Sequence, residues 1–146
     1  MPTLSPPAQT VRERREHACS LFESRWQTGQ FDPDLVTEDY QACGLTTEPT
    51  DAAGEAAAVA AVHEAFPDLR TTVRAVVCEG DFVAVHFSAT GTHERPIAGV
   101  SATGEQVRTG GMVLYAFEDG LVAESRTFLD VSSLLDVWDG IDSPST

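Results

Sequence analysis

The second half of this chain contains four stretches rich in β-branched and aromatic residues, and this pattern restricts the fold more than any other feature. The first two stretches are separated by Glu-Gly-Asp at 79–81, the last two by Glu-Asp-Gly at 118–120, and the middle two by a longer loop over 93–105. Short connections with glycine and aspartate join neighbouring antiparallel strands. The pattern therefore predicts an antiparallel meander over residues 71–130.

Two helical segments precede these strands. Thr10 and Glu13 have the spacing of a capping box, so a first helix is expected to begin there and to run to about residue 29. An alanine-rich run after Asp51 predicts a second helix that ends at Pro67. Between the two helices we expect a helical turn at 34–36 and a short strand at 39–43.

This order of elements predicts an α+β domain in which the helices cover one face of a strongly curved antiparallel sheet and enclose a pocket. A last segment, Val131–Trp138, has apolar residues at helical spacing and is expected to close the domain. The length of 146 residues fits one domain. We place this single domain at 9–139, with flexible tails at 1–8 and 140–146.

The chain is strongly acidic, which excludes several classes of partner. It has nine basic residues, all arginine, against 23 acidic ones, for a formal charge of −14. Such a surface repels nucleic acids and anionic membranes. There is no apolar run of membrane-spanning length and no secretion signal, so a cytoplasmic location is expected. The three cysteines lack the spacing of a disulfide framework or a zinc site, and no metal is expected.

Several short pieces in a fixed order resemble the SnoaL-like polyketide cyclase family, within the nuclear-transport-factor-2-like superfamily. The pieces are Phe-Pro-Asp-Leu at 66–69, Glu-Gly-Asp at 79–81, Gly-Thr-His at 91–93, Thr-Gly at 103–104 and Phe-Glu-Asp-Gly at 117–120. The resemblance covers about residues 53–138. It implies a cone-shaped fold around a pocket, a homodimer formed through the open face of the sheet, and chemistry without a metal or organic cofactor.

The resemblance places the acid/base aspartate of such cyclases at Asp130, shortly before a Ser-Leu-Leu segment. A carboxylate that ends a strand and faces a cavity is partly desolvated, which raises its pKa toward the range useful in acid–base chemistry. In these enzymes the aspartate serves an intramolecular aldol ring closure. Alternatively, Asp130 caps the helix that follows it.

Strand alternation groups Arg126 and Phe128 with Asp130 on one face, and we expect this face to line the pocket and bind substrate. Arg126 departs from the family pattern, in which a tryptophan usually stands at this position. It can pair with Asp130, bind an anionic substrate group or stabilise an enolate oxygen. Alternatively, it pairs with Glu124 at the surface.

Four further residues are candidates for the site. His93 ends a strand at the mouth of the long loop, and histidine titrates near neutral pH, so it is the second catalytic candidate; alternatively it only holds the loop. Phe87 belongs to an apolar strand face that is expected to be buried. Tyr40 and Trp26 are placed to reach the pocket from the first strand and first helix, or they are core aromatics.

These observations predict a cofactor-independent cyclase or isomerase that acts on a hydrophobic, oxygenated small molecule with Asp130 as acid/base. A second enzymatic alternative is an epoxide hydrolase or epoxide-opening cyclase of the same fold, in which Asp130 activates a water molecule. The non-enzymatic alternative is a dimeric ligand-binding or scaffold protein, in which Asp130 caps a helix and Arg126 pairs with Glu124.

Overall fold

The computed structural model describes residues 9–130, so the predicted helix at 131–138 and both predicted tails lie outside the described residues. Helix α1 spans Val11–Trp26, and Thr10 and Glu13 form the predicted capping box. Helix α2 spans Ala52–Ala65, with the side chain of Asp51 accepting a hydrogen bond from the amide of Gly54. Both predicted helices are confirmed.

The four predicted strands of the second half are also confirmed. They are β2 (Arg70–Glu79), β3 (Phe82–Thr92), β4 (Gln106–Glu118) and β5 (Leu121–Leu129), and each pairs antiparallel with the next. A short turn, η1 (Pro33–Leu35), leads into the longer-than-expected β1 (Val36–Cys43).

Strand β1 gives the sheet a parallel pair that the sequence pattern did not reveal. The strand order is β1-β5-β4-β3-β2, and β1 runs parallel to β5 at the edge of the sheet. The chain reaches β1 before the meander begins, so no hairpin restricts the direction of this strand. The sheet is therefore mixed, although its central strands are antiparallel.

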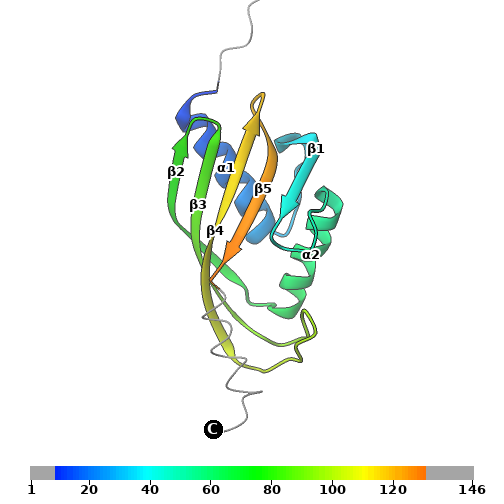
Figure 1. Cartoon of the computed structure of the whole chain (residues 1–146). Coiled ribbons are helices and arrows are strands. Elements are labelled where there is room, and N and C mark those ends of the chain that lie inside the picture. The colour runs from blue at the N-terminus through cyan, green and yellow to red at the C-terminus, as the bar shows by residue number, and fades with distance from the viewer. Residues whose placement is uncertain (1–8, 131–146) are drawn as a thin grey trace, which may run out of the picture.

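The sheet curves around α1, and α2 lies next to β1 (Figure 1). Helix α1 packs against β2 and β3, whereas α2 packs against β1. The inner face of the sheet supplies most of the core, with alternate residues of β3 and β4 buried against α1: Val83, Val85, Phe87, Val113, Tyr115 and Phe117. This arrangement is the predicted cone-shaped α+β fold.

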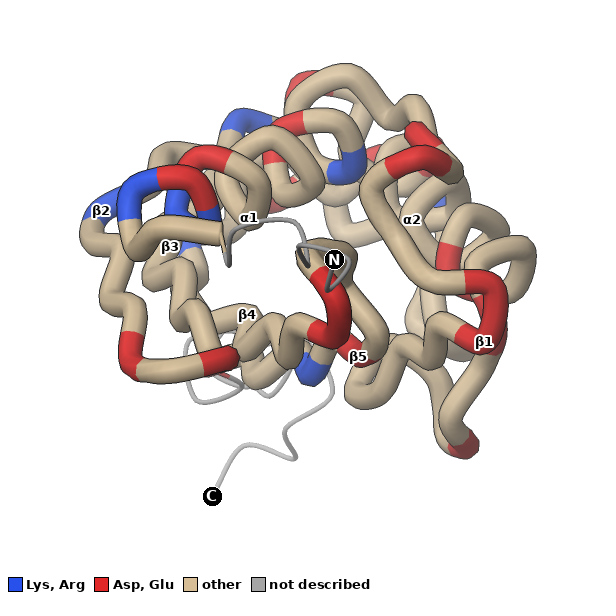
Figure 2. Tube along the Cα trace, turned by 90° about the horizontal axis from the view of Figure 1, so that it is seen from above, with Lys and Arg blue, Asp and Glu red and all other residues tan. Residues whose placement is uncertain are grey.

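Acidic positions are spread over the helices, strands and turns of the molecule (Figure 2). Within residues 9–130, no helix combines the length and the apolar character needed to cross a membrane.

Candidate functional site

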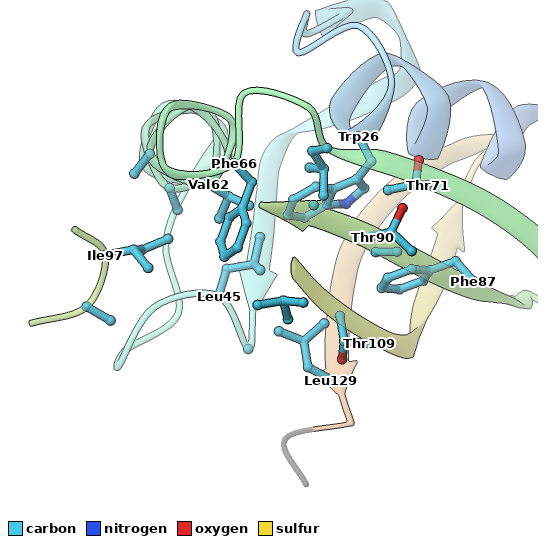
Figure 3. A pocket seen from close by; sticks show the side chains of 18 residues that line it. Trp26, Leu45, Val62, Phe66, Thr71, Phe87, Thr90, Ile97, Thr109 and Leu129 are labelled. Atoms are coloured by element: carbon cyan, nitrogen blue, oxygen red, sulfur yellow. The ribbon is translucent and has the colours of Figure 1, made fainter. Parts of the chain in front are cut away.

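A pocket of about 400 Å³ opens between α2, the C-terminal end of α1, the C-terminal half of β3 and the N-terminal half of β4 (Figure 3). This volume is within the range usual for small-molecule sites. Its lining is dominated by large apolar side chains: Trp26, Leu45, Val62, Phe66, Leu69, Phe87, Ile97, Val107 and Leu129. The polar lining residues are three threonines: Thr71, Thr90 and Thr109. Among residues 9–130, no ionisable side chain lines the pocket.

Two of the predicted substrate-contacting residues, Trp26 and Phe87, line this pocket. Trp26 is the last residue of α1 and belongs to the buried stripe of that helix. Phe87 lies on the inner face of β3, where its ring packs against Phe22 of α1 at a centroid distance of 5.1 Å. The alternation of β3 and the stripe of α1 thus bring two aromatic rings to one cavity.

Asp130 is attached to the rim of the pocket. It directly follows Leu129, a lining residue, and its carbonyl accepts a hydrogen bond of 3.1 Å from the hydroxyl of Thr109, another lining residue. Its backbone amide donates to the carbonyl of Gly110 at 2.7 Å. Asp130 itself is exposed and is not among the lining residues. The helix that it was predicted to cap lies outside the described residues.

His93 lies behind one wall of the pocket rather than in its lining. Its fully buried ring stacks on Phe66 with centroids 5.3 Å apart, and Phe66 lines the pocket. The Nδ1 atom of His93 is 3.3 Å from the hydroxyl of Thr103. Its backbone amide donates to Glu105, and its carbonyl accepts from Gly104. These contacts join the two ends of the 93–105 loop.

Arg126 and Phe128 lie on the outer face of the sheet, whereas we expected them to line the pocket. Both are more than half exposed, and the Nε atom of Arg126 is 2.7 Å from a carboxylate oxygen of Glu124. The residues of β5 that point inward are Ser125 and Thr127. Alternation shows which side chains share a face, but α1, α2 and β1 decide which face becomes the interior.

Tyr40 also lies outside the pocket lining, in a buried cluster that we did not predict. Its hydroxyl is 2.9 and 3.0 Å from the two carboxylate oxygens of Glu55 and 2.7 Å from the hydroxyl of Ser125. The carboxylate of Glu55 also accepts a hydrogen bond of 3.2 Å from the Ser125 hydroxyl, and the Nη2 atom of Arg25 is 2.6 Å from Glu55 Oε1. We refer to Arg25, Tyr40, Glu55 and Ser125 as the buried polar cluster.

Burial keeps the phenol of this cluster protonated. Loss of solvent, followed by the negative charge of Glu55, raises the pKa of Tyr40 far above its usual value. The phenol therefore acts as a hydrogen-bond donor to Glu55. The guanidinium of Arg25 balances the carboxylate charge and lies 3.9 Å from the ring centroid of Phe31.

The sequence contained a signal for this cluster. Arg25 lies among the apolar positions of α1, and Glu55 lies one turn before Val59 on the apolar stripe of α2. A single charge on each of two apolar stripes indicates a buried ion pair between the helices.

Among residues 9–130, no group of three metal-ligating side chains is found.

A family model described as SnoaL-like polyketide cyclase matches residues 16–136. The chain belongs to the SnoaL-like polyketide cyclase family. The match covers most of α1, all of α2, all five strands and every described residue that lines the pocket. A search of curated proteins finds no significant match.

Several solved structures have the same fold. A candidate SnoaL-like polyketide cyclase from Jannaschia sp. CCS1 is 27% identical, with a TM-score of 0.75, and the alignment covers 98% of this chain and 100% of that one. AclR, a candidate hydroxylase from Streptomyces galilaeus, is 24% identical with a TM-score of 0.73, covering 87% and 96%. IdmH, a candidate polyketide cyclase from Streptomyces antibioticus, is 24% identical with a TM-score of 0.70, covering 86% and 97%.

Proposed function

We propose that this protein binds a hydrophobic, oxygenated small molecule of polyketide type and closes a ring in it by acid–base chemistry, without a cofactor. The observation that carries the proposal is the apolar pocket with Asp130 attached to its rim through Thr109 and Leu129. Apolar walls favour a hydrophobic substrate because binding removes apolar surface from water.

In the proposed reaction, the Asp130 carboxylate removes a proton from an acidic C–H group between two carbonyls of the substrate. The resulting enolate carbon attacks another carbonyl of the same molecule, outside this pair. This attack forms the new C–C bond and leaves an alkoxide. Asp130 then returns its proton to the alkoxide, so the net reaction is an isomerisation. His93 positions the pocket wall through its stacking on Phe66, and Arg126 takes no part.

The test compares the wild type with Asp130→Asn on a panel of polyketide-like β-dicarbonyl esters and epoxides. We expect Asp130→Asn to lower kcat by about 10² to 10⁴, the usual contribution of a general acid or base. Asp119→Asn is the matched control, because Asp119 is an exposed residue of the turn at the other end of β5. Equal turnover by the wild type and Asp130→Asn would contradict the acid/base role of Asp130. Turnover of epoxides alone assigns the epoxide-opening alternative.

A second candidate function is ligand binding without catalysis. It is favoured by the lining of the pocket, in which no ionisable side chain occurs among the described residues. This function predicts that substrates bind the wild type and Asp130→Asn equally and that neither protein converts them. Product analysis after prolonged incubation separates the two candidates.

We also propose that the outer face of the sheet forms a homodimer. This face carries exposed apolar side chains on adjacent strands: Phe82 is 53% exposed, Met112 41% and Phe128 58%. Met112 and Phe128 are direct cross-strand partners, so they form one continuous patch. An exposed apolar patch on a sheet of this kind is typical of a subunit interface.

A further inference from the structure

Trp26 brings a hydrogen-bond donor to the wall of the pocket. Its side chain is only 9% exposed, and it lines the pocket at the end of α1. Within the described part of the chain, no hydrogen bond engages its indole N–H. The ring packs in the apolar core and lies 6.3 Å, centroid to centroid, from the ring of His63. A largely buried tryptophan normally finds an acceptor for this group. The missing acceptor is therefore best supplied from the pocket.

The edge of the indole that carries the nitrogen faces the side of the pocket on which Thr71 and Thr90 lie (Figure 3). These two threonines stand on the paired strands β2 and β3, one register step apart, because Thr71 pairs with Ala89 and Thr90 with Arg70. The hydroxyl of Thr71 is itself buried and without a hydrogen bond in the described residues. The nitrogen thus lies at the most polar part of an otherwise apolar lining.

The chemistry of the lining defines which ligand group fits there. Trp26 is the only lining residue, among those described, with a nitrogen in its side chain, and an indole N–H can only donate. The ligand group must therefore accept a hydrogen bond. It must also be uncharged, because no cationic side chain among residues 9–130 lines the pocket to offset the cost of burying an anion.

We propose that the indole N–H of Trp26 donates a hydrogen bond to a carbonyl oxygen of the bound ligand. This inference rests on the proposed function, since it takes the pocket to be a small-molecule site. It narrows the ligand class to hydrophobic molecules with an uncharged ketone or ester carbonyl at the end that is bound beside Trp26. The donor fixes the orientation of the ligand, and the apolar walls supply most of the affinity.

Fluorenone and fluorene test this inference, because the two tricyclic molecules differ chiefly in the carbonyl of fluorenone and have similar shapes. Affinities are measured by displacement of a neutral fluorescent naphthylamine dye. We expect the wild type to prefer fluorenone by about tenfold, the usual effect of one buried hydrogen bond. Trp26→Phe keeps an aromatic wall and loses the N–H, so this preference is expected to disappear while fluorene still binds.

An NMR measurement on the wild type gives an independent readout. The chain has two tryptophans, and the spectrum of Trp26→Phe identifies the indole signal of Trp26 by its loss. We expect fluorenone to move this N–H proton downfield relative to fluorene. Equal affinities with equal shifts overturn the inference and leave the proposed pocket intact. Failure of both compounds to displace the dye from the wild type overturns the proposed function and the inference together.

Discussion

At the scale of single residues, the buried polar cluster is the strongest electrostatic feature of the core. Arg25 and Glu55 are both at least nine-tenths buried, and the hydroxyls of Tyr40 and Ser125 donate hydrogen bonds to the Glu55 carboxylate. A buried charge is tolerated only when it is paired and hydrogen-bonded. The cluster therefore ties α1, α2, β1 and β5 together at one point.

Removal of Glu55 is expected to destabilise the protein strongly. Glu55→Ala leaves the Arg25 guanidinium buried without its partner, so the free energy of unfolding is predicted to fall by about 3–5 kcal/mol. The control is Glu64→Ala, because Glu64 pairs with Arg95 at the exposed surface and such pairs contribute about 0–1 kcal/mol. Urea unfolding measures both changes. Equal losses in the two variants would contradict a special role for the cluster.

The sequence predicted some of these residues better than others. Phe87 was expected on a buried strand face, which is clear from its apolar neighbours, and Trp26 was a pocket candidate because the fold lines its cavity from the first helix; both line the pocket. Tyr40 was predicted to reach the pocket or to lie in the core, but its hydroxyl donates a hydrogen bond to Glu55, 15 residues away in the sequence. Such a pairing depends on the packing of α2 against β1, which local patterns do not contain.

At the scale of elements, alternation predicted the faces of β3 correctly and misassigned the inner face of β5. On β3 the buried residues are apolar, so polarity and position agree. On β5 the inner residues include Ser125 and Thr127, whereas Phe128 points outward. Polarity is misleading here because Ser125 is needed by the buried polar cluster. The parallel pairing with β1 was also invisible in the sequence, since no short turn connects the two strands.

The connection between α2 and β2 is fastened by Asp68. The carboxylate accepts hydrogen bonds from the backbone amide of Thr92 at 2.7 Å and from its hydroxyl at 2.8 Å. The hydrogen bond from the Thr92 amide has the largest effect and the one from its hydroxyl the next largest. Together they lower the pKa of Asp68 below its usual value of 3.8. This contact holds the end of β3 directly beside His93.

Because the folded pKa of Asp68 is depressed, its contribution to stability is fully present above pH 4 or so and is lost as the pH falls through the folded pKa. Asp68→Asn is therefore expected to be less stable than the wild type at pH 7, with the difference shrinking toward pH 3. Urea unfolding at the two pH values measures it. A difference that is the same at both values would show that the carboxylate charge does not matter.

At the scale of the whole molecule, the acidic charge and the apolar outer face act in opposite directions. The formal charge of −14 favours separation of the molecules, whereas the patch around Met112 and Phe128 favours association. Both the family and the cone-shaped fold could be predicted from the sequence, because the order of short motifs and strands can be recognised without knowledge of long-range contacts. The association state depends on a surface that only the folded sheet assembles.

Phe128→Glu is predicted to convert a dimer into a monomer, because it places a charge within the apolar patch. Val11→Glu is the control, since Val11 is 49% exposed but lies on α1, away from this face of the sheet. Light scattering coupled to size-exclusion chromatography gives the mass of each protein. A monomeric wild type, or a dimeric Phe128→Glu, would contradict the proposed interface.

The proposed role of the pocket between α2 and the sheet is to bind a small molecule, and a matched pair of variants on α2 tests this role. Ala58 lines the pocket, whereas its neighbour Ala57 is exposed and does not. Phenylalanine at 58 occupies the cavity, and phenylalanine at 57 adds the same group outside it.

The decisive measurement is the affinity of fluorenone for the wild type, Ala58→Phe and Ala57→Phe. We expect saturable binding to the wild type and to Ala57→Phe, and a loss of affinity of at least tenfold in Ala58→Phe, about 1.4 kcal/mol. Unchanged binding to Ala58→Phe, or no binding to the wild type, would contradict this role of the pocket.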